Sequence, residues 1–205
     1  MNRLEELIQK LCPNGVEYVA LGTLARISDG YAFKASDLKE DGKYPVFKIT
    51  NIKKGIVEIE KYFIDKIPED YKYDDILTGR EILIGMSGST GKTGINLNLK
   101  VKCLVNQRIA IIKPDLNKTV EGYLKHILVN SKFEIYCNKK GTGPQKNIGK
   151  SVIEEYEVPF PPMEVQSEIV RILDNFTLLT AELTAELTAR KEQYEFYRDY
   201  LFNFG

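Results

Sequence analysis

Apolar side chains recur at helical spacing over about the last forty residues of the chain, from Met163 to Leu201. Neither glycine nor proline interrupts this stretch after Pro162. Such a pattern, sustained over several heptads, predicts one long helix with a coiled-coil seam. The two lines of this seam are mostly apolar: Ile169, Phe176, Leu183, Arg190 and Tyr197, and Leu173, Thr180, Leu187, Tyr194 and Leu201.

The predicted helix is too long to be covered by the rest of the chain. At about 1.5 Å per residue, a helix from Val165 to Phe202 would be roughly 57 Å long. A compact chain of this size has a radius of gyration of only about 17 Å. We therefore expect the seam to contact a second copy or a partner protein, rather than pack along its own domain. The candidate dimerisation residues are Ile169, Leu173, Phe176, Leu183, Leu187, Tyr194, Tyr197 and Leu201.

The preceding residues show shorter patterns. A short helix is expected over 3–11, with Leu4, Leu7, Ile8 and Leu11 on the face that would pack against the long helix. Alternation predicts strands at 44–50, 56–59, 81–86, 94–99, 100–105, 108–113 and 156–160, and a second helix is expected over 119–131. The predicted fold class is α+β, with a β-rich domain at 1–160 followed by one long coiled-coil helix at 161–205.

Composition indicates an ordinary globular chain: 205 residues, 43% hydrophobic and 28% charged. No apolar run approaches the roughly twenty residues of a membrane span. The first residues begin an amphipathic helix and not a signal peptide, so we expect a cytoplasmic protein without membrane contact. The three cysteines, Cys12, Cys103 and Cys137, are widely spaced and predict neither a disulfide framework nor a metal site.

Charge is unevenly distributed along a chain that is formally neutral. Residues 90–150 carry 12 Lys and Arg against 3 Asp and Glu, whereas residues 151–205 carry 4 against 11. A basic segment of this kind is typical of a phosphate-binding surface, although it can also be an ordinary solvated face. The sequence thus favours nucleic acid as a partner of the middle third.

Three catalytic interpretations fail on the residues. The segment 86–93 resembles a phosphate-binding loop, but Met86 replaces the first glycine and an alternating stretch follows in place of a helix. The Phe160-Pro161-Pro162 segment lacks the Asn or Asp of an amino-methyltransferase motif, and the acidic-x-Lys order of a metal nuclease is absent. His126 has no Ser, Cys or acidic partner nearby in the sequence. We expect no enzyme activity and no cofactor.

Several segments together resemble the specificity (S) subunit of type I restriction–modification systems. The matching segments are Leu11-Cys12-Pro13-Asn14-Gly15-Val16-Glu17-Tyr18, Phe47-Lys48-Ile49-Thr50-Asn51-Ile52, Met86-Ser87-Gly88-Ser89-Thr90-Gly91-Lys92, Asn106-Gln107-Arg108, Val158-Pro159-Phe160-Pro161-Pro162-Met163-Glu164-Val165-Gln166, and the repeated Thr-Ala-Glu-Leu between Thr180 and Leu187. The resemblance implies a non-catalytic domain that reads one half of a bipartite DNA sequence, followed by a spacer helix. It also implies methyltransferase (M) and restriction (R) subunits as partners.

Full-length members of that family have two recognition domains and two antiparallel spacer helices. This sequence has one of each, so we expect a half-subunit, either natural or truncated. The simplest source of the second half is an identical copy of the chain. The alternative from another functional class is a non-catalytic coiled-coil adaptor that binds protein. The adaptor interpretation does not explain the excess of Lys and Arg in residues 90–150.

Candidate DNA contacts are the polar residues of predicted turns. Lysines suit phosphate, and the forked groups of Arg, Gln and Asn suit base edges, although each residue could instead be an ordinary solvated loop position. The phosphate candidates are Lys92, Lys139, Lys140 and Lys146; the base-edge candidates are Gln107, Arg108, Gln145 and Asn147; the remaining candidates are Lys48, Asn51, Lys53, Ser89, Thr93 and Thr142.

Overall fold

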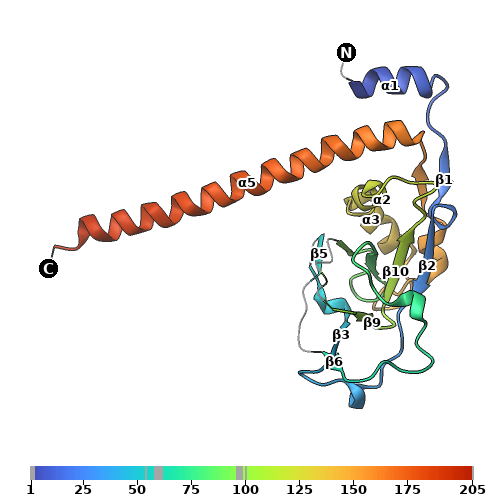
Figure 1. Cartoon of the computed structure of the whole chain (residues 1–205), viewed down its shortest axis with the longest axis horizontal. Coiled ribbons are helices and arrows are strands. Elements are labelled where there is room, and N and C mark those ends of the chain that lie inside the picture. Colours follow the sequence, from blue (N-terminus) through green and yellow to red (C-terminus); the bar gives the residue numbers. More distant parts are fainter. Residues whose placement is uncertain (1–2, 54, 58–61, 96–98, 100, 205) are drawn as a thin grey trace.

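One long helix projects from a body that contains the rest of the chain (Figure 1). The computed structural model describes residues 3–53, 55–57, 62–95, 99 and 101–204. The long helix, α5, runs from Met163 to Phe202, as the apolar pattern predicted. At about 1.5 Å per residue its 40 residues span about 60 Å.

The largest sheet of the described residues has strand order β2-β10-β7-β8-β5-β4. Its strands pair antiparallel except β5 with β8, which are parallel. The bounds are β2 Ala25–Asp29, β4 Ile52–Lys53, β5 Gly55–Val57, β7 Ile82–Gly85, β8 Thr93–Ile95 and β10 Ile109–Pro114. Strands β7 and β10 are buried along most of their length, so they form the centre of the fold.

Each face of β7 and β10 packs on a different layer, because successive side chains of a strand point to opposite faces. Ile82, Ile84 and Ile112 pack among the helices α2 (Tyr123–Leu128), α3 (Ser131–Lys140) and α4 (Lys150–Glu154). Leu83 and Ile111 pack on the other side against Phe47 and Val105. These last two belong to a small sheet of order β6-β3-β9, formed by β6 (Phe63–Ile64), β3 (Tyr44–Phe47) and β9 (Leu104–Val105).

The two ends of the body lie together. Strand β1 (Tyr18–Ala20) pairs antiparallel with β11 (Glu157–Pro159), the strand that leads into α5. Helix α1 (Arg3–Leu11) lies against the start of α5, and the Arg3 Nε is 3.7 Å from the Glu168 Oε2. The expected packing of the first helix on the long one is therefore confirmed. The short 3-10 helices are Leu21–Thr23, Ala35–Asp37, Ile49–Asn51 and Tyr73–Asp75.

The predicted helix over 119–131 was wrong in extent. Asn130 accepts a hydrogen bond from the Lys132 backbone N–H and so caps a separate helix, α3. The apolar pattern signals α3 only weakly, since Phe133 and Cys137 alone of its residues are buried. The predicted strand 94–99 begins at Thr93, and residues 96–98 lie outside the described part of the chain.

The first turns of α5 are anchored in the body by a buried amide. Gln166 is fully buried; its Oε1 accepts from the Val120 N–H at 3.0 Å and its Nε2 donates to the Pro161 carbonyl at 2.9 Å. Val165 and Val170 are buried beside it. From Leu173 onward, the described residues of the helix are exposed. The helix is therefore held at its first turns and, apart from a contact of Asp174 with His126, is exposed over the rest.

Replacing Gln166 with Leu should destabilise the fold by about 2 kcal/mol, because buried backbone groups lose their partners. Urea unfolding followed by circular dichroism measures the change. Gln9→Leu, at an exposed position of α1, is the matched control and should change stability by less than about 0.5 kcal/mol. Equal effects of the two substitutions would show that the amide does not anchor the helix.

Candidate nucleic-acid interface

A closed loop connects β7 to β8 at the end of the central sheet. The Gly85 N–H donates to the Lys92 carbonyl and the Gly91 N–H donates to the Gly85 carbonyl, each at 2.9 Å. Gly91 has a φ of +78°, and a Cβ there would lie 2.8 Å from the Cβ of Cys137. The loop thus needs glycine for its shape and its packing on α3. A strand follows it, which agrees with the rejection of a nucleotide-binding loop.

A tight turn connects β9 to β10, with Gln107 and Arg108 at its two corners. The Ile109 N–H donates to the Asn106 carbonyl at 3.1 Å and closes the turn. Two further bonds hold it from outside: the Asn106 N–H donates to the Phe47 carbonyl at 2.9 Å, and the Gln107 N–H donates to the Tyr31 carbonyl at 3.0 Å. The backbone is fixed while the Gln107 and Arg108 side chains are exposed.

A hairpin follows α3. Thr142 and Asn147 exchange backbone hydrogen bonds of 3.0 and 2.8 Å, and the Lys146 N–H donates to the Gly143 carbonyl at 3.0 Å. Gly143 and Lys146 both have positive φ angles, +72° and +48°. The tip at Gln145 and Lys146 is therefore presented on a defined backbone.

Backbone hydrogen bonds join these three segments into one surface. The Met86 N–H donates to the Arg108 carbonyl at 2.9 Å, and the Ile148 N–H donates to the Met86 carbonyl at 3.0 Å. The Gly88 N–H donates to the Gln145 carbonyl at 2.9 Å. We give the name basic loop face to the sequence-predicted candidates that these segments and the adjoining end of α3 carry. Its residues are Ser89, Lys92, Gln107, Arg108, Lys139, Lys140, Thr142, Gln145, Lys146 and Asn147, of which Lys92 is half-buried and the others exposed.

Four candidates lie outside this face or cannot serve on it. Asn51 is buried and its Oδ1 accepts from the Lys48 N–H at 2.7 Å; Thr93 is buried and its hydroxyl donates to the Leu128 carbonyl at 2.8 Å. Because neither side chain reaches solvent, we remove both from the candidate set. The Lys48 ammonium lies 3.4 Å from the centre of the Tyr62 ring. Lys53 ends β4, and its side chain lies outside the described residues.

One residue of the interface was missed by sequence reasoning. Tyr31 supports the turn at Gln107 through its carbonyl, and Gly30 packs so closely that an added Cβ would lie 2.2 Å from the Asn106 oxygen. The available signal was Asp29-Gly30, which indicates only a turn. The segment around Gly30 and Tyr31 contacts residues 105–109, which lie about 75 positions further along the chain. No local sequence pattern reveals a contact over such a separation.

The free part of α5 exposes its apolar seam. Seven of the eight predicted dimerisation residues, Leu173 to Leu201, have exposed fractions between 37% and 68%. Ile169 differs, because it packs on the core beneath α2. A shallow groove of about 750 Å³ begins at the seam residues Leu173 and Phe176 and continues along Thr and Ala side chains to Thr188. Each threonine hydroxyl in this groove donates to the carbonyl four residues earlier, which leaves the methyl groups as partners for another surface.

Comparison with known proteins decides the family. Residues 13–192 match the family model described as the type I restriction modification DNA specificity domain. The chain belongs to this family. The resemblance to type I specificity subunits is therefore confirmed.

Two curated relatives and one solved structure of specificity subunits illustrate the match. The chain is 30% identical, over its full length, to the type I restriction enzyme EcoR124I/EcoR124II specificity subunit of Escherichia coli, and spans 48% of that protein. It is 52% identical over 119 residues to the type I restriction enzyme MpnII specificity subunit of Mycoplasma pneumoniae, with 56% of this chain and 35% of that one covered. The chain thus spans about half the length, or less, of these relatives.

The crystal structure of the HsdS subunit from Thermoanaerobacter tengcongensis has the same fold, with a TM-score of 0.63 at 17% sequence identity. The alignment covers 89% of this chain and 44% of that one. Within the described part of the chain, no helix has the length and apolar character of a membrane span. The same residues contain no group of His, Cys, Asp and Glu suited to a metal ion.

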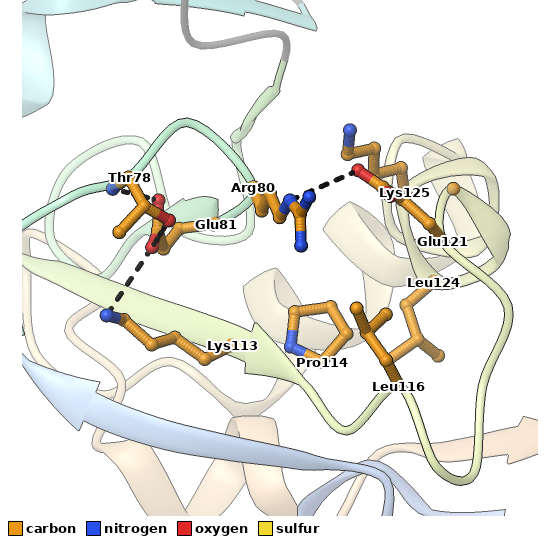
Figure 2. Close-up of a pocket in the computed structure, with 10 residues that line it drawn as sticks. Thr78, Arg80, Glu81, Lys113, Pro114, Leu116, Glu121, Leu124 and Lys125 are labelled. Carbon is orange, nitrogen blue, oxygen red and sulfur yellow. Dashed lines mark hydrogen bonds and ion pairs between the residues drawn. The ribbon is translucent and has the colours of Figure 1, made fainter. Parts of the chain in front are cut away.

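The specificity domain also holds a small cavity of about 180 Å³ beside α2, between Pro114, Leu124 and a buried carboxylate (Figure 2). The Glu81 Oε2 accepts from the Thr78 and Gly79 N–H groups, both at 2.9 Å, and its Oε1 lies 3.4 Å from the Lys113 Nζ. Burial alone would raise the pKa of Glu81, but the hydrogen bonds from Thr78 and Gly79 outweigh it and hold the pKa below its ordinary value. This carboxylate fastens the turn before β7.

A second polar contact ties the body to α5 farther along the helix. The His126 Nε2 lies 2.8 Å from the Asp174 Oδ1. Sequence reasoning missed this partner because the two residues are 48 positions apart. The single histidine thus has a structural role, because it links α2 to the long helix.

Glu81→Gln should destabilise the domain at neutral pH by about 1 to 3 kcal/mol, since donors to a charged acceptor are weakened. The folded pKa lies below the unfolded one, so the ionised group contributes fully above the unfolded pKa, and the contribution is lost as pH falls through the folded pKa. Urea unfolding between pH 3 and 7 should show the difference from wild type shrinking at the acid end. Glu121→Gln, at an exposed carboxylate 3.8 Å from Arg80, is the control. A pH-independent difference would contradict the assignment.

Proposed function

We propose that this chain is a non-catalytic, sequence-specific DNA-recognition component of a type I restriction–modification system. One observation carries the proposal: the basic loop face joins three separate loops of a DNA specificity domain into one surface. Its ten residues include five cations, Lys92, Arg108, Lys139, Lys140 and Lys146. Such a surface suits the phosphate backbone of double-stranded DNA.

The residues of the face divide into two roles. Lysines at the ends of α3 and of the loops can neutralise phosphates from several positions, because an ammonium group on a long stem tolerates variation in geometry. Gln107 and Arg108 stand on a turn whose backbone is bonded on both sides, and Gln145 stands at the hairpin tip. Their forked groups suit bidentate contacts to base edges in the major groove. We therefore assign base reading to these three residues and to Asn147.

The proposed assembly is an antiparallel homodimer through α5. The two halves of the free helix differ in bulk: the half near the body carries the Thr and Ala groove, and the distal half carries Tyr194, Tyr197 and Leu201. An antiparallel pair places the half of each copy that carries Tyr194 and Tyr197 against the groove of the other, whereas a parallel pair would place groove against groove. The exposed seam residues of both halves, such as Leu183 and Tyr197, would then be covered.

In such a dimer each body reads one half of an interrupted, inverted site, and the helices set the distance between the halves. By the same family relationship, the dimer would position methyltransferase and restriction subunits on the DNA. Selection of bound DNA from a random library, with this chain alone, tests the proposal. We expect two inverted half-sites separated by a constant gap. Recovery of unrelated sequences would reject sequence-specific recognition.

Two substitutions separate the proposed roles. Arg108→Ala should relax one position of each half-site, at a cost of about 1 to 3 kcal/mol in discrimination. Lys92→Ala should weaken all sequences alike and reduce the slope of log affinity against log salt by about 0.9 for each phosphate that is no longer neutralised. Fluorescence anisotropy with the selected site and its single-base variants measures both. An unchanged base preference in the Arg108 variant would remove its reading role.

The repeats in α5 allow a test of the spacing. Deleting Thr180-Ala181-Glu182-Leu183 shortens each helix by about 6 Å and keeps the apolar face nearly in register. The preferred gap should change by one or two base pairs, at about 3.4 Å each, while the half-site sequences stay the same. Glu182→Ala keeps the length and the seam residue Leu183, and is the control. A gap that is unchanged by the deletion would show that the helix does not set the spacing.

A further inference from the structure

The turn that carries Gln107 and Arg108 follows strand β9, and within the described residues only one edge of β9 is paired with another strand. Strand β3 pairs with one edge of β9. On the other edge, the Val105 carbonyl accepts from the Tyr31 N–H at 2.8 Å, and the Tyr31 carbonyl accepts from the Gln107 N–H at 3.0 Å. The Val105 N–H points the same way and donates to the phenol oxygen of Tyr71 at 3.2 Å. A side chain therefore takes the place of a strand at the base of this turn.

Tyr71 is itself fixed from several sides. The residue is 8% exposed, and its hydroxyl donates to the Asp75 carbonyl at 3.2 Å. The Asp75 carboxylate accepts from Arg26 at 2.8 Å and from Ser28 at 2.7 Å. Both partners lie on β2, the strand that leads into Gly30 and Tyr31. The hydroxyl thus links two supports of the turn, the segment around Tyr31 and strand β9.

The chemistry of the phenol suits a permanent support. Burial raises the pKa of Tyr71 above its already high ordinary value, so the hydroxyl stays protonated and keeps its bond to Asp75. The Tyr31 ring lies 5.6 Å from the Tyr71 ring, which fills the space beneath the turn. The hydroxyl is also the partner that keeps the buried Val105 N–H from being left without an acceptor.

We propose that Tyr71 is a positioning residue for base recognition. It holds the Gln107–Arg108 turn in the position from which both side chains reach base edges. It contacts no DNA. The inference rests on the reading role proposed above for Gln107 and Arg108. Bidentate contacts require placement within about 0.5 Å, whereas lysine–phosphate attraction tolerates larger shifts. Loss of the support should therefore reduce discrimination between sequences and leave general DNA affinity unchanged.

Tyr71→Phe keeps the ring and removes only the hydroxyl. We expect discrimination between the selected site and its single-base variants to fall about tenfold, at the positions that Arg108→Ala relaxes. Affinity for unrelated DNA, and its dependence on salt, should match wild type. Tyr123→Phe is the control, because this buried tyrosine also donates one hydrogen bond, at 2.9 Å, to the carbonyl of Pro159 on β11 and not to a support of the turn. It should cost similar stability and leave discrimination intact.

The outcomes separate the two proposals. If Tyr71→Phe keeps full discrimination while Arg108→Ala loses it, the positioning role is wrong and the reading role stands. If Arg108→Ala also keeps full discrimination, the reading role itself fails. If the Tyr71 and Tyr123 variants lost discrimination equally, the loss would be explained by lower stability, and the positioning role would be overturned.

Ser28→Ala provides a second, milder test, which also applies if the Tyr71 variant does not fold. It removes one donor to Asp75 and leaves Arg26 in place. We expect a smaller loss of discrimination at the same positions. Unchanged discrimination in a folded Ser28 variant, together with a Tyr71 variant that does not fold, would overturn the proposal.

Discussion

The pairing of β7 with β10 is the constraint on which the rest of the structure depends. Both strands are covered on both faces, so a slip in register would misplace two layers at once. The register sets Gly85 opposite Ile109. The loop after β7 and the turn before β10 therefore leave the sheet side by side. A structural requirement of the core thus determines where the exposed polar residues lie.

The second constraint is the packing of the N-terminal segment of the body against the segment that leads into α5. Strands β1 and β11 pair, α1 lies on the start of α5, and Gln166 fastens that start to Val120 and Pro161. The direction of the helix is consequently fixed relative to the basic loop face. A rigid junction of this kind is what a spacer needs, because its length can only define a distance if its angle is constant.

Much of this arrangement could be predicted from the sequence, and the reasons differ by element. The long helix could be predicted because its apolar pattern is local and extends over several heptads. Strands β7, β10 and β11 could be predicted from short apolar runs. Helix α3 could not be predicted in this way, since it buries only two side chains. The clustering of residues around Met86, Arg108 and Gln145 was only implied by charge, because their contacts join distant segments. Burial of Asn51 and Thr93 was missed for the same reason: both look like polar turn residues in the sequence.

The most direct test of the proposed assembly is the solution mass of the DNA-free chain, measured by sedimentation over a range of protein concentrations. We expect a species of twice 23.4 kDa, in which two copies cover their exposed seams and present two basic loop faces. Leu183→Asp in the middle of the seam should return the monomer, and Glu182→Asp beside it should not. A mass of 23.4 kDa at every concentration would contradict the homodimer and leave the seam for a different protein.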